Sequence, residues 1–85
     1  MMEVDMSANC PCCEFKTFDR NSRGNYEICP VCFWEDDPSQ EADPNYEGGA
    51  NGVSLNQARA NYKKWGAIKY ELIRYVRAPS DKEKI

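Results

Sequence analysis

The chain has 85 residues and a net charge of −3, and it contains five cysteines but no histidine. A chain this short is expected to form one domain, residues 1–85, whose hydrophobic core alone leaves it marginally stable, so a further cross-link is expected. The absence of histidine excludes histidine-activated nucleophiles, histidine general bases and mixed cysteine/histidine zinc sites. No catalytic motif is present, and we expect no enzyme.

Several features predict a cytoplasmic location. The first six residues carry two acidic side chains and lack the apolar segment of a signal peptide. Nowhere does the chain approach the roughly 18 consecutive apolar residues that a membrane helix needs. In a reducing compartment, clustered cysteines favour metal ligation over disulfides.

Residues 1–9 are expected to form a flexible tail that leads into the first of two cysteine pairs. In each pair a proline follows the first cysteine, and two residues separate the ligands, which turns both sulfurs toward one ion. The proline fixes φ and reduces the disorder that metal binding has to overcome. The spacing predicts a zinc ribbon with one structural zinc ion held by four thiolates. The predicted ligands are Cys10, Cys13, Cys29 and Cys32.

The fifth cysteine, Cys12, is left over from a four-ligand site. Without it, the first pair repeats the spacing of the second, so Cys12 is interpreted as the spare; the alternative is that it replaces a neighbouring ligand. A spare Cys12 either faces outward, packs under Phe33, or acts as a redox sensor whose pKa the nearby zinc lowers. We favour the first two roles, because four thiolates around a zinc ion repel a further anion.

Between the two pairs, the pattern predicts a short antiparallel hairpin. Residues 15–18 are bulky and suited to a strand, and residues 26–28 alternate apolar and polar side chains as they return to the second pair. Residues 19–25 are rich in turn formers and are expected at the tip. Beyond the second pair, Phe33 and Trp34 either continue as a third strand or cover the metal site.

An acidic loop rich in proline and glycine follows at residues 35–52. Loops of this length are commonly either disordered or functional. We interpret it either as a solvated linker or as a partner-binding loop, because Tyr46 lies among carboxylates and the glycines let the backbone approach a partner. Its carboxylates lack the spacing of a calcium-binding loop. The side chains expected to contact a partner are Glu35, Asp36, Asp37, Asp43, Tyr46 and Glu47.

The C-terminal part is predicted to be helical. Ser54 and Gln57 form a capping box that starts a helix, and Gly66 ends it. A second helical segment is expected over about residues 68–76, followed by a flexible tail at residues 80–85. The predicted fold class is therefore small α+β, a zinc ribbon with one or two C-terminal α-helices packed on it. The aromatic residues expected to pack on the ribbon are Tyr62 and Trp65.

Four strings of the chain are long or specific: CPCC at residues 10–13, GNYEICPVCFWEDD at residues 24–37, GGANGVSL at residues 48–55, and Val76-Arg77. Over about residues 9–79 they resemble the bacterial cysteine-rich CPCC family. This resemblance implies a small zinc-binding protein. Some members resemble immunity proteins that neutralise secreted bacterial toxins, which implies an immunity or inhibitor role.

The charge distribution separates two binding hypotheses. Residues 1–52 hold 11 Asp and Glu against three Lys and Arg, whereas residues 53–85 hold eight Lys and Arg against three Asp and Glu. We expect a protein-binding module whose acidic half binds a basic protein, because opposite charges speed encounter. The alternative is a nucleic-acid-binding zinc ribbon, which the net negative charge disfavours, and the charge dipole also permits self-association. The basic residues of the alternative are Arg59, Lys63, Lys64, Lys69, Arg74 and Arg77.

Overall fold

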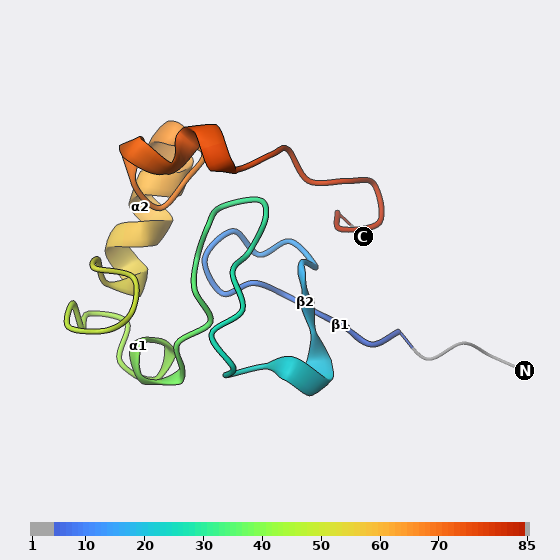
Figure 1. Ribbon diagram of the computed structural model, residues 1–85, viewed down its shortest axis with the longest axis horizontal. Helices are drawn as coiled ribbons and strands as arrows, with labels where there is room; N and C mark the ends of the chain where they lie inside the picture. Colours follow the sequence, from blue (N-terminus) through green and yellow to red (C-terminus); the bar gives the residue numbers. More distant parts are fainter. Residues whose placement is uncertain (1–4, 85) are drawn as a thin grey trace, which may run out of the picture.

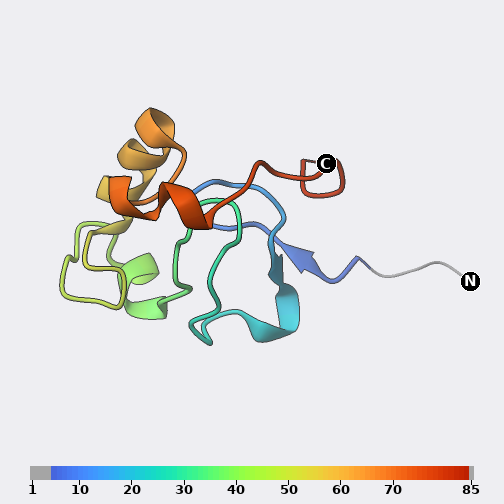
Figure 2. The same cartoon turned by 45° about the horizontal axis from the view of Figure 1, so that its top comes forward.

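Two cysteine-bearing turns lie at the centre of the computed structural model, which describes residues 5–84 (Figure 1). In chain order the regular elements are β1 (Ser7–Ala8), β2 (Phe18–Asp19), the 3-10 helix η1 (Arg20–Ser22), α1 (Pro38–Ala42), α2 (Leu55–Trp65) and the 3-10 helix η2 (Tyr70–Tyr75). Helices α2 and η2 lie on one side of the turns and the strand pair lies on the other, as a second view also shows (Figure 2). The fold is small α+β with one two-stranded antiparallel sheet among the described residues, which confirms the α+β part of the predicted class.

Each cysteine turn is enclosed by its own pair of extended segments. Strand β1 precedes the first turn and pairs antiparallel with β2, which follows it. Across the second turn, Ile28 forms an isolated antiparallel bridge with Glu35. The flanks of a tight turn are already close in space, so pairing them costs little loop-closure entropy.

The single hairpin predicted between residues 15–18 and 26–28 is therefore wrong. The carboxylate of Asp19 accepts a hydrogen bond of 2.8 Å from the N–H of Asn21 and caps η1, which ends β2 after two residues. A side chain that caps a helix offers the backbone an alternative to a strand ladder. The chain leaves η1 through Gly24, whose φ of +80° turns it back toward the second pair.

The described parts of both expected tails contact the rest of the fold. Ser7 and Ala8 form β1, and the N–H of Lys16 donates to the carbonyl oxygen of Glu83 at 2.9 Å. The carboxylate of Glu83 in turn accepts two hydrogen bonds, of 2.8 and 2.9 Å, from the guanidinium of Arg77. Residues 1–4 and Ile85 lie outside the described residues.

Helix α2 begins and ends where the sequence predicts. The hydroxyl of Ser54 accepts the N–H of Gln57 at 3.1 Å, and the side-chain oxygen of Gln57 accepts the N–H of Ser54 at 2.8 Å. At the other end Gly66 adopts a φ of +82°, and its N–H donates to the carbonyl oxygen of Tyr62. Within residues 5–84, no helix combines the length and apolar character that crossing a bilayer requires.

The second predicted helix is shorter than expected and is a 3-10 helix. The N–H of Ile68 donates to the carbonyl oxygen of Cys32 at 2.9 Å, and Lys69 is extended, with φ −145° and ψ 148°. The extended backbone of Lys69 keeps this stretch out of a helix, and regular structure resumes only at Tyr70. Residues 68–76 were predicted from apolar spacing, which carries no information about this tertiary bond.

The expected acidic loop contains α1 and is organised by buried amides. Asp37 caps α1 by accepting the N–H of Ser39 at 2.9 Å, and Pro38 occupies the first helical position, where its missing N–H costs nothing. Gln40 is fully buried. Its Nε2 donates to the carbonyl oxygens of Tyr46 and Val53 at 2.9 and 2.8 Å, and its Oε1 accepts both the N–H and Nδ2 of Asn51.

The buried core is centred on the cysteines. Leu55 and Ala58 on α2 are buried beside the turns, and Trp34 is buried completely. So few large apolar side chains contribute only modestly to stability, because each gives roughly 1.5–3 kcal/mol on full burial. The buried apolar cluster comprises Cys10, Cys12, Cys13, Phe18, Cys29, Val31, Cys32, Trp34, Leu55, Ala58 and Ile68.

Gly49→Ala is expected to destabilise the protein by about 1–3 kcal/mol, the range for overpacking a filled interior. A Cβ at this position would overlap the buried side chain of Gln40 and the capping carboxylate of Asp37. Urea denaturation of the metal-loaded protein measures the change. Gly48→Ala is the control, because its Cβ first meets the side chain of the exposed Tyr46, which can move. Equal stability of the two variants would contradict the role of the packed loop.

Candidate metal centre

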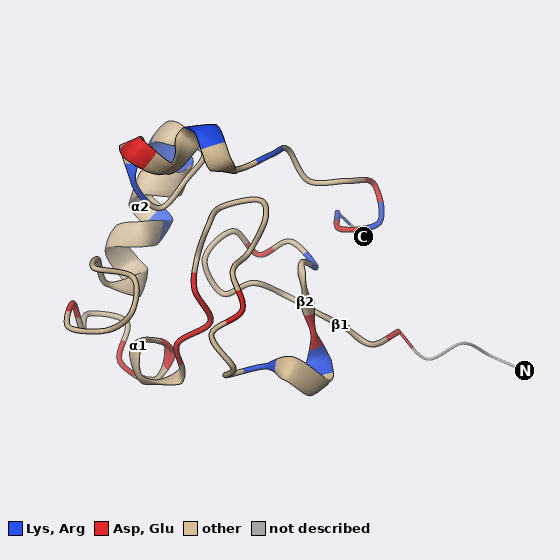
Figure 3. Ribbon diagram, viewed as in Figure 1, with Lys and Arg blue, Asp and Glu red and all other residues tan. Residues whose placement is uncertain are grey.

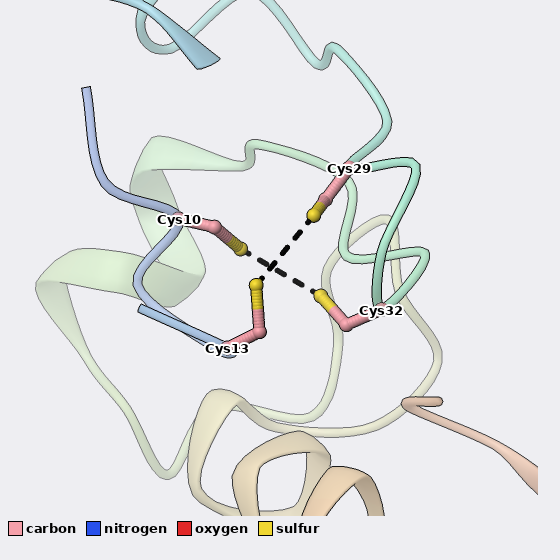
Figure 4. Close-up of side chains that lie close together, drawn as sticks. All are labelled: Cys10, Cys13, Cys29 and Cys32. Atoms are coloured by element: carbon pink, nitrogen blue, oxygen red, sulfur yellow. Dashed lines mark hydrogen bonds between the residues drawn. The ribbon is translucent and has the colours of Figure 1, made fainter. Parts of the chain in front are cut away.

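Four cysteine sulfurs converge on one point between the two turns (Figure 4). Cys10 Sγ lies 3.6 Å from Cys32 Sγ, and Cys13 Sγ lies 3.7 Å from Cys29 Sγ. All four sulfurs lie within 4.8 Å of one another, and all four residues are buried. The structure therefore brings together the four residues that the sequence predicts as ligands, two from each turn.

The spacing of the sulfurs suits a tetrahedral ion. Four sulfurs at about 2.3 Å from a central zinc ion lie about 3.8 Å apart, because a tetrahedron's edge is about 1.6 times its centre-to-corner distance. The Cys10–Cys32 and Cys13–Cys29 sulfur distances are close to this value. The donor set can therefore hold a metal ion, and four protein ligands complete a tetrahedron without a position for water or substrate.

The two turns repeat one backbone design. In each, the first cysteine's N–H bonds to the carbonyl oxygen five residues ahead, and its own carbonyl oxygen accepts the N–H four residues ahead, at 2.8 to 2.9 Å. The fourth residue ahead is left-handed in both turns: Glu14 has a φ of +71° and Phe33 of +75°. Such a conformation is uncommon outside glycine and persists only where the surroundings enforce it. The convergence of the sulfurs supplies such a constraint.

The repeat also shows what Cys12 replaces. Cys12 occupies the position in the first turn that Val31 occupies in the second, and the two side chains are 6% and 1% exposed. Cys12 lies outside the group of four converging sulfurs. A buried free cysteine behaves as a small hydrophobe, so its place in the core is that of an apolar residue. This agrees with packing rather than outward exposure.

A family model described as Cysteine-rich CPCC matches residues 8–83. The chain belongs to the cysteine-rich CPCC family. The match includes both cysteine turns and the helices that cover them, so the CPCC family pattern spans nearly the whole described structure. The comparison with curated proteins found no match.

Hydrogen bonds to the sulfurs come from the CPCC protein's own backbone and from one hydroxyl. Thr17 Oγ1 lies 3.0 Å from Cys29 Sγ, and the N–H of Trp34 donates to Cys32 Sγ at 3.4 Å. Hydrogen bonds from Cys10 and Cys13 lower the pKa of Cys29, whereas hydrogen bonding to Cys10 raises the pKa of Cys32. Because metal ligation requires thiolates, a metal ion that binds here has to displace the protons of the four thiols.

The helical half attaches to both turns through backbone carbonyl oxygens. Arg59 Nε of α2 donates to the carbonyl oxygen of Pro11 at 2.9 Å. The N–H of Arg77 donates to the carbonyl oxygen of Pro30 at 3.1 Å, in addition to the bond between Ile68 and the second turn. Each proline therefore does more than shape its cysteine turn, because its carbonyl oxygen accepts a hydrogen bond from a segment distant in the chain.

The aromatic residues divide between the ribbon half and the helices. Tyr62 packs on the buried cluster, and burial with the nearby cysteines raises its pKa to about 12. Trp65 does not pack on that cluster. Its ring makes an edge contact with the ring of Tyr70, with 5.8 Å between the ring centroids. The prediction for Trp65 is therefore wrong, because η2 folds back onto α2 and covers it. Trp34 is completely buried in the cluster, and its Nε1 donates to Glu41 Oε2 at 3.2 Å.

Two of the predicted partner-binding carboxylates are buried. Asp36 is 0% exposed, and it accepts two hydrogen bonds from the guanidinium of Arg23, of 2.8 and 3.2 Å, and one from the N–H of Gly24. Asp37 is 4% exposed and accepts the N–H of Ala50 besides capping α1. A buried carboxylate satisfied by internal donors cannot present charge to a partner. The expectation for these two residues is therefore corrected.

The remaining predicted contact residues are on or near the surface. Asp43, Tyr46 and Glu47 are exposed, and Glu35 is half-buried. Glu35 is held through its backbone, whose N–H and carbonyl oxygen bond to the side chain of Asn51 at 2.7 and 2.9 Å.

The interior polar residues have weak sequence signals. Thr17 is a polar residue between two phenylalanines, and Arg23 is one of only three cations in an acidic half, which are hints of specific contacts. Gln40 and Asn51 carry no such hint, because surface loops are rich in amides. Their partners are the backbone of segments up to 16 residues away.

Asp36 and Glu41 share Arg23, and their pKa values move apart. Burial and the neighbouring carboxylate of Asp36 raise the pKa of Glu41 to about 7. Burial would also raise the pKa of Asp36, but contacts with Glu41, Arg23 and the N–H of Gly24 outweigh it and lower that pKa. Asp36 thus carries the negative charge opposite Arg23, and Glu41 holds a proton more readily.

Glu41→Gln is expected to flatten the pH dependence of stability. Because the pKa of Glu41 is raised from 4.5 to about 7, its contribution to stability is present below about pH 4.5 and is lost as the pH rises through 7. The variant cannot ionise, so its unfolding free energy relative to the wild type should rise by about 1–2 kcal/mol from about pH 5 to about pH 8. Urea denaturation at each pH measures the difference.

The pH dependence of metal binding cancels in this comparison, because both proteins carry the same four cysteines. Glu47→Gln, which alters an exposed carboxylate, should follow the wild type at every pH. A constant difference between Glu41→Gln and the wild type would show that Glu41 ionises normally in the folded protein.

Proposed function

We propose that this CPCC protein is a structural-zinc protein that acts as a protein-binding module. The observation that carries the zinc assignment is the buried group of four cysteine sulfurs at tetrahedral spacing. Tetrahedral all-sulfur sites are typical of zinc or of iron–sulfur centres, and one closed set of four thiolates suits a single structural zinc ion. Zinc supplies no redox chemistry, so its role here is to hold the two turns together.

The proposed partner is a basic protein. Acidic residues gather on the segments around α1, and lysines and arginines on α2 and η2 (Figure 3). Exposed Asp43, Tyr46 and Glu47 form the docking surface of this proposal, in which a tyrosine provides contact area and carboxylates provide attraction. The cationic active site of a toxin nuclease would complement this acidic docking surface. Such a partner fits the immunity or inhibitor role implied by the family resemblance.

Nucleic-acid binding is the second candidate, and one observation favours it. Helix η2 exposes Tyr70 and Tyr75, 66% and 61% accessible, on either side of the exposed Arg74. Exposed aromatic rings beside cations are the elements of single-strand binding, in which bases stack on the rings. The net charge of −3 opposes it, so it ranks below the protein partner.

Elemental analysis of the purified native protein is expected to give one zinc per chain. Cys12→Val should keep this ratio, because Val31 already fills the equivalent position in the second turn. Cys13→Ser should lose most of its zinc, because it removes one of four sulfurs, and chelation of the native protein should abolish its near-ultraviolet circular dichroism. Iron in place of zinc, or loss of the metal in Cys12→Val, would overturn the assignment.

The binding proposal is tested with labelled protein against a panel of basic nuclease domains and a single-stranded RNA oligonucleotide. Saturable binding to a nuclease domain that weakens in Asp43→Lys and Glu47→Lys, and at raised salt, supports the acidic docking surface. Asp81→Lys, an exposed acidic residue outside that surface, is the matched control and should bind normally. RNA binding that is lost in Tyr70→Ala would instead select the second candidate.

A further inference from the structure

A cavity lies between the first cysteine turn and α2, beside the four-sulfur cluster, and the cluster residue Cys13 forms part of its wall. Its volume is about 290 Å³. This lies at the lower end of the range of small-molecule sites, which is roughly 300–1,000 Å³, and therefore suits one small molecule rather than a macromolecule. The residues that line it include Cys12, Glu14, Phe15, Arg59, Tyr62 and Lys63.

The helix side of the cavity is cationic. Arg59 and Lys63 are four residues apart on α2, so they lie on the same face, one turn from each other. None of the salt bridges within residues 5–84 involves either of them. Arg59 uses Nε for Pro11 and Nη1 for Asn56, at 2.9 and 3.4 Å, which fixes the guanidinium at the edge of the cavity. Two cations without carboxylate partners thus border one hollow.

The opposite wall is mostly apolar. Cys12 is 94% buried from solvent overall, and Phe15 is half-buried beside it, so the floor of the cavity offers a sulfur and a ring. Cys13 and Tyr62 complete the lining. Glu14 is exposed and adds one carboxylate to the lining. Its negative charge repels an anion and so acts against the attraction of the two cations.

A simpler role for the cations would be to offset the negative charge of the metal-bound thiolates. The hydrogen bonds to the sulfurs among the described residues, other than those between the cysteines, come from Thr17 and from the N–H of Trp34. Arg59 instead directs two of its donors at a carbonyl and an amide oxygen. Neither Arg59 nor Lys63 donates a hydrogen bond to a cysteine sulfur within residues 5–84, and Arg59 keeps the donors of Nη2 for a ligand in the cavity.

We propose that this cavity binds a small organic anion. Its carboxylate or phosphate group lies between Arg59 and Lys63, and its apolar part lies against Cys12 and Phe15. An arginine beside a second cation is the common solution for holding such groups, because the guanidinium offers parallel donors. The site is separate from the proposed docking surface, so the inference does not depend on a protein partner.

The test is a titration of the folded, metal-loaded protein with phenyl phosphate and with benzoate, followed by two-dimensional amide NMR at constant ionic strength. Saturable shifts are expected at Phe15, Arg59, Tyr62 and Lys63. The tighter of the two probes shows whether the site prefers phosphate or carboxylate. Benzyl alcohol has the ring without the charge. It should bind at least about threefold more weakly than the tighter of the two anions.

The variants should change the affinity in opposite directions. Lys63→Gln should weaken binding by about threefold, and Glu14→Gln should strengthen it by a similar factor, because one removes an attraction and the other a repulsion. Lys64→Gln is the matched control: its ammonium lies over the ring of Trp65, 5.0 Å from the centroid, outside the cavity lining. Arg59 is left intact, because its bond to Pro11 supports the turn.

Each variant is first checked for native metal content and a dispersed amide spectrum, so loss of the fold is distinguished from loss of the site. Absence of saturable shifts with both probes would overturn the proposal. Equal weakening in Lys63→Gln and Lys64→Gln would do so too, because it would show general attraction to a basic helix.

Discussion

The convergence of four cysteine sulfurs is the constraint on which the rest of this small protein depends. Buried thiolates repel one another at 3.6 to 3.7 Å unless an ion lies between them. Structural zinc sites contribute roughly 10–16 kcal/mol in peptides that fold on metal, as much as the whole net stability of a typical domain, about 5–15 kcal/mol. The strained left-handed residues Glu14 and Phe33 persist because the four sulfurs must meet.

The outer parts of the fold hold to the turns through polar contacts rather than through a large apolar interface. Backbone carbonyl oxygens of Pro11, Cys32 and Pro30 each accept one hydrogen bond from the helical half. The loop around α1 is organised in the same way by Gln40 and Asn51. No buried side-chain nitrogen or oxygen within residues 5–84 lacks a partner. Fully satisfied polar networks of this kind specify one arrangement, because every alternative leaves a group unpaired.

This internal use of polar groups reshapes the functional surface. Some of the carboxylates that make the sequence acidic are buried: Asp36 pairs with Arg23, and Asp37 caps α1. The acidic docking surface that we propose is therefore smaller than the run of charges suggests. The exposed tyrosines of η2 lie on the basic half, and the cavity lies between the first cysteine turn and α2. Three surfaces of different chemistry thus occupy separate parts of an 85-residue chain.

The sequence by itself determined the local features, and tertiary structure decided how they meet. The spacing of the cysteines predicted the four-sulfur group, and Ser54, Gln57 and Gly66 predicted the limits of α2, because turns and caps depend on neighbouring residues. The pairing of β1 with β2, the 3-10 form of η2, the position of Trp65 and the burial of Asp36 were not predictable. Each depends on which other segment a residue meets, such as the carbonyl of Cys32 for Ile68, and hydrophobic or charge patterns do not encode that choice.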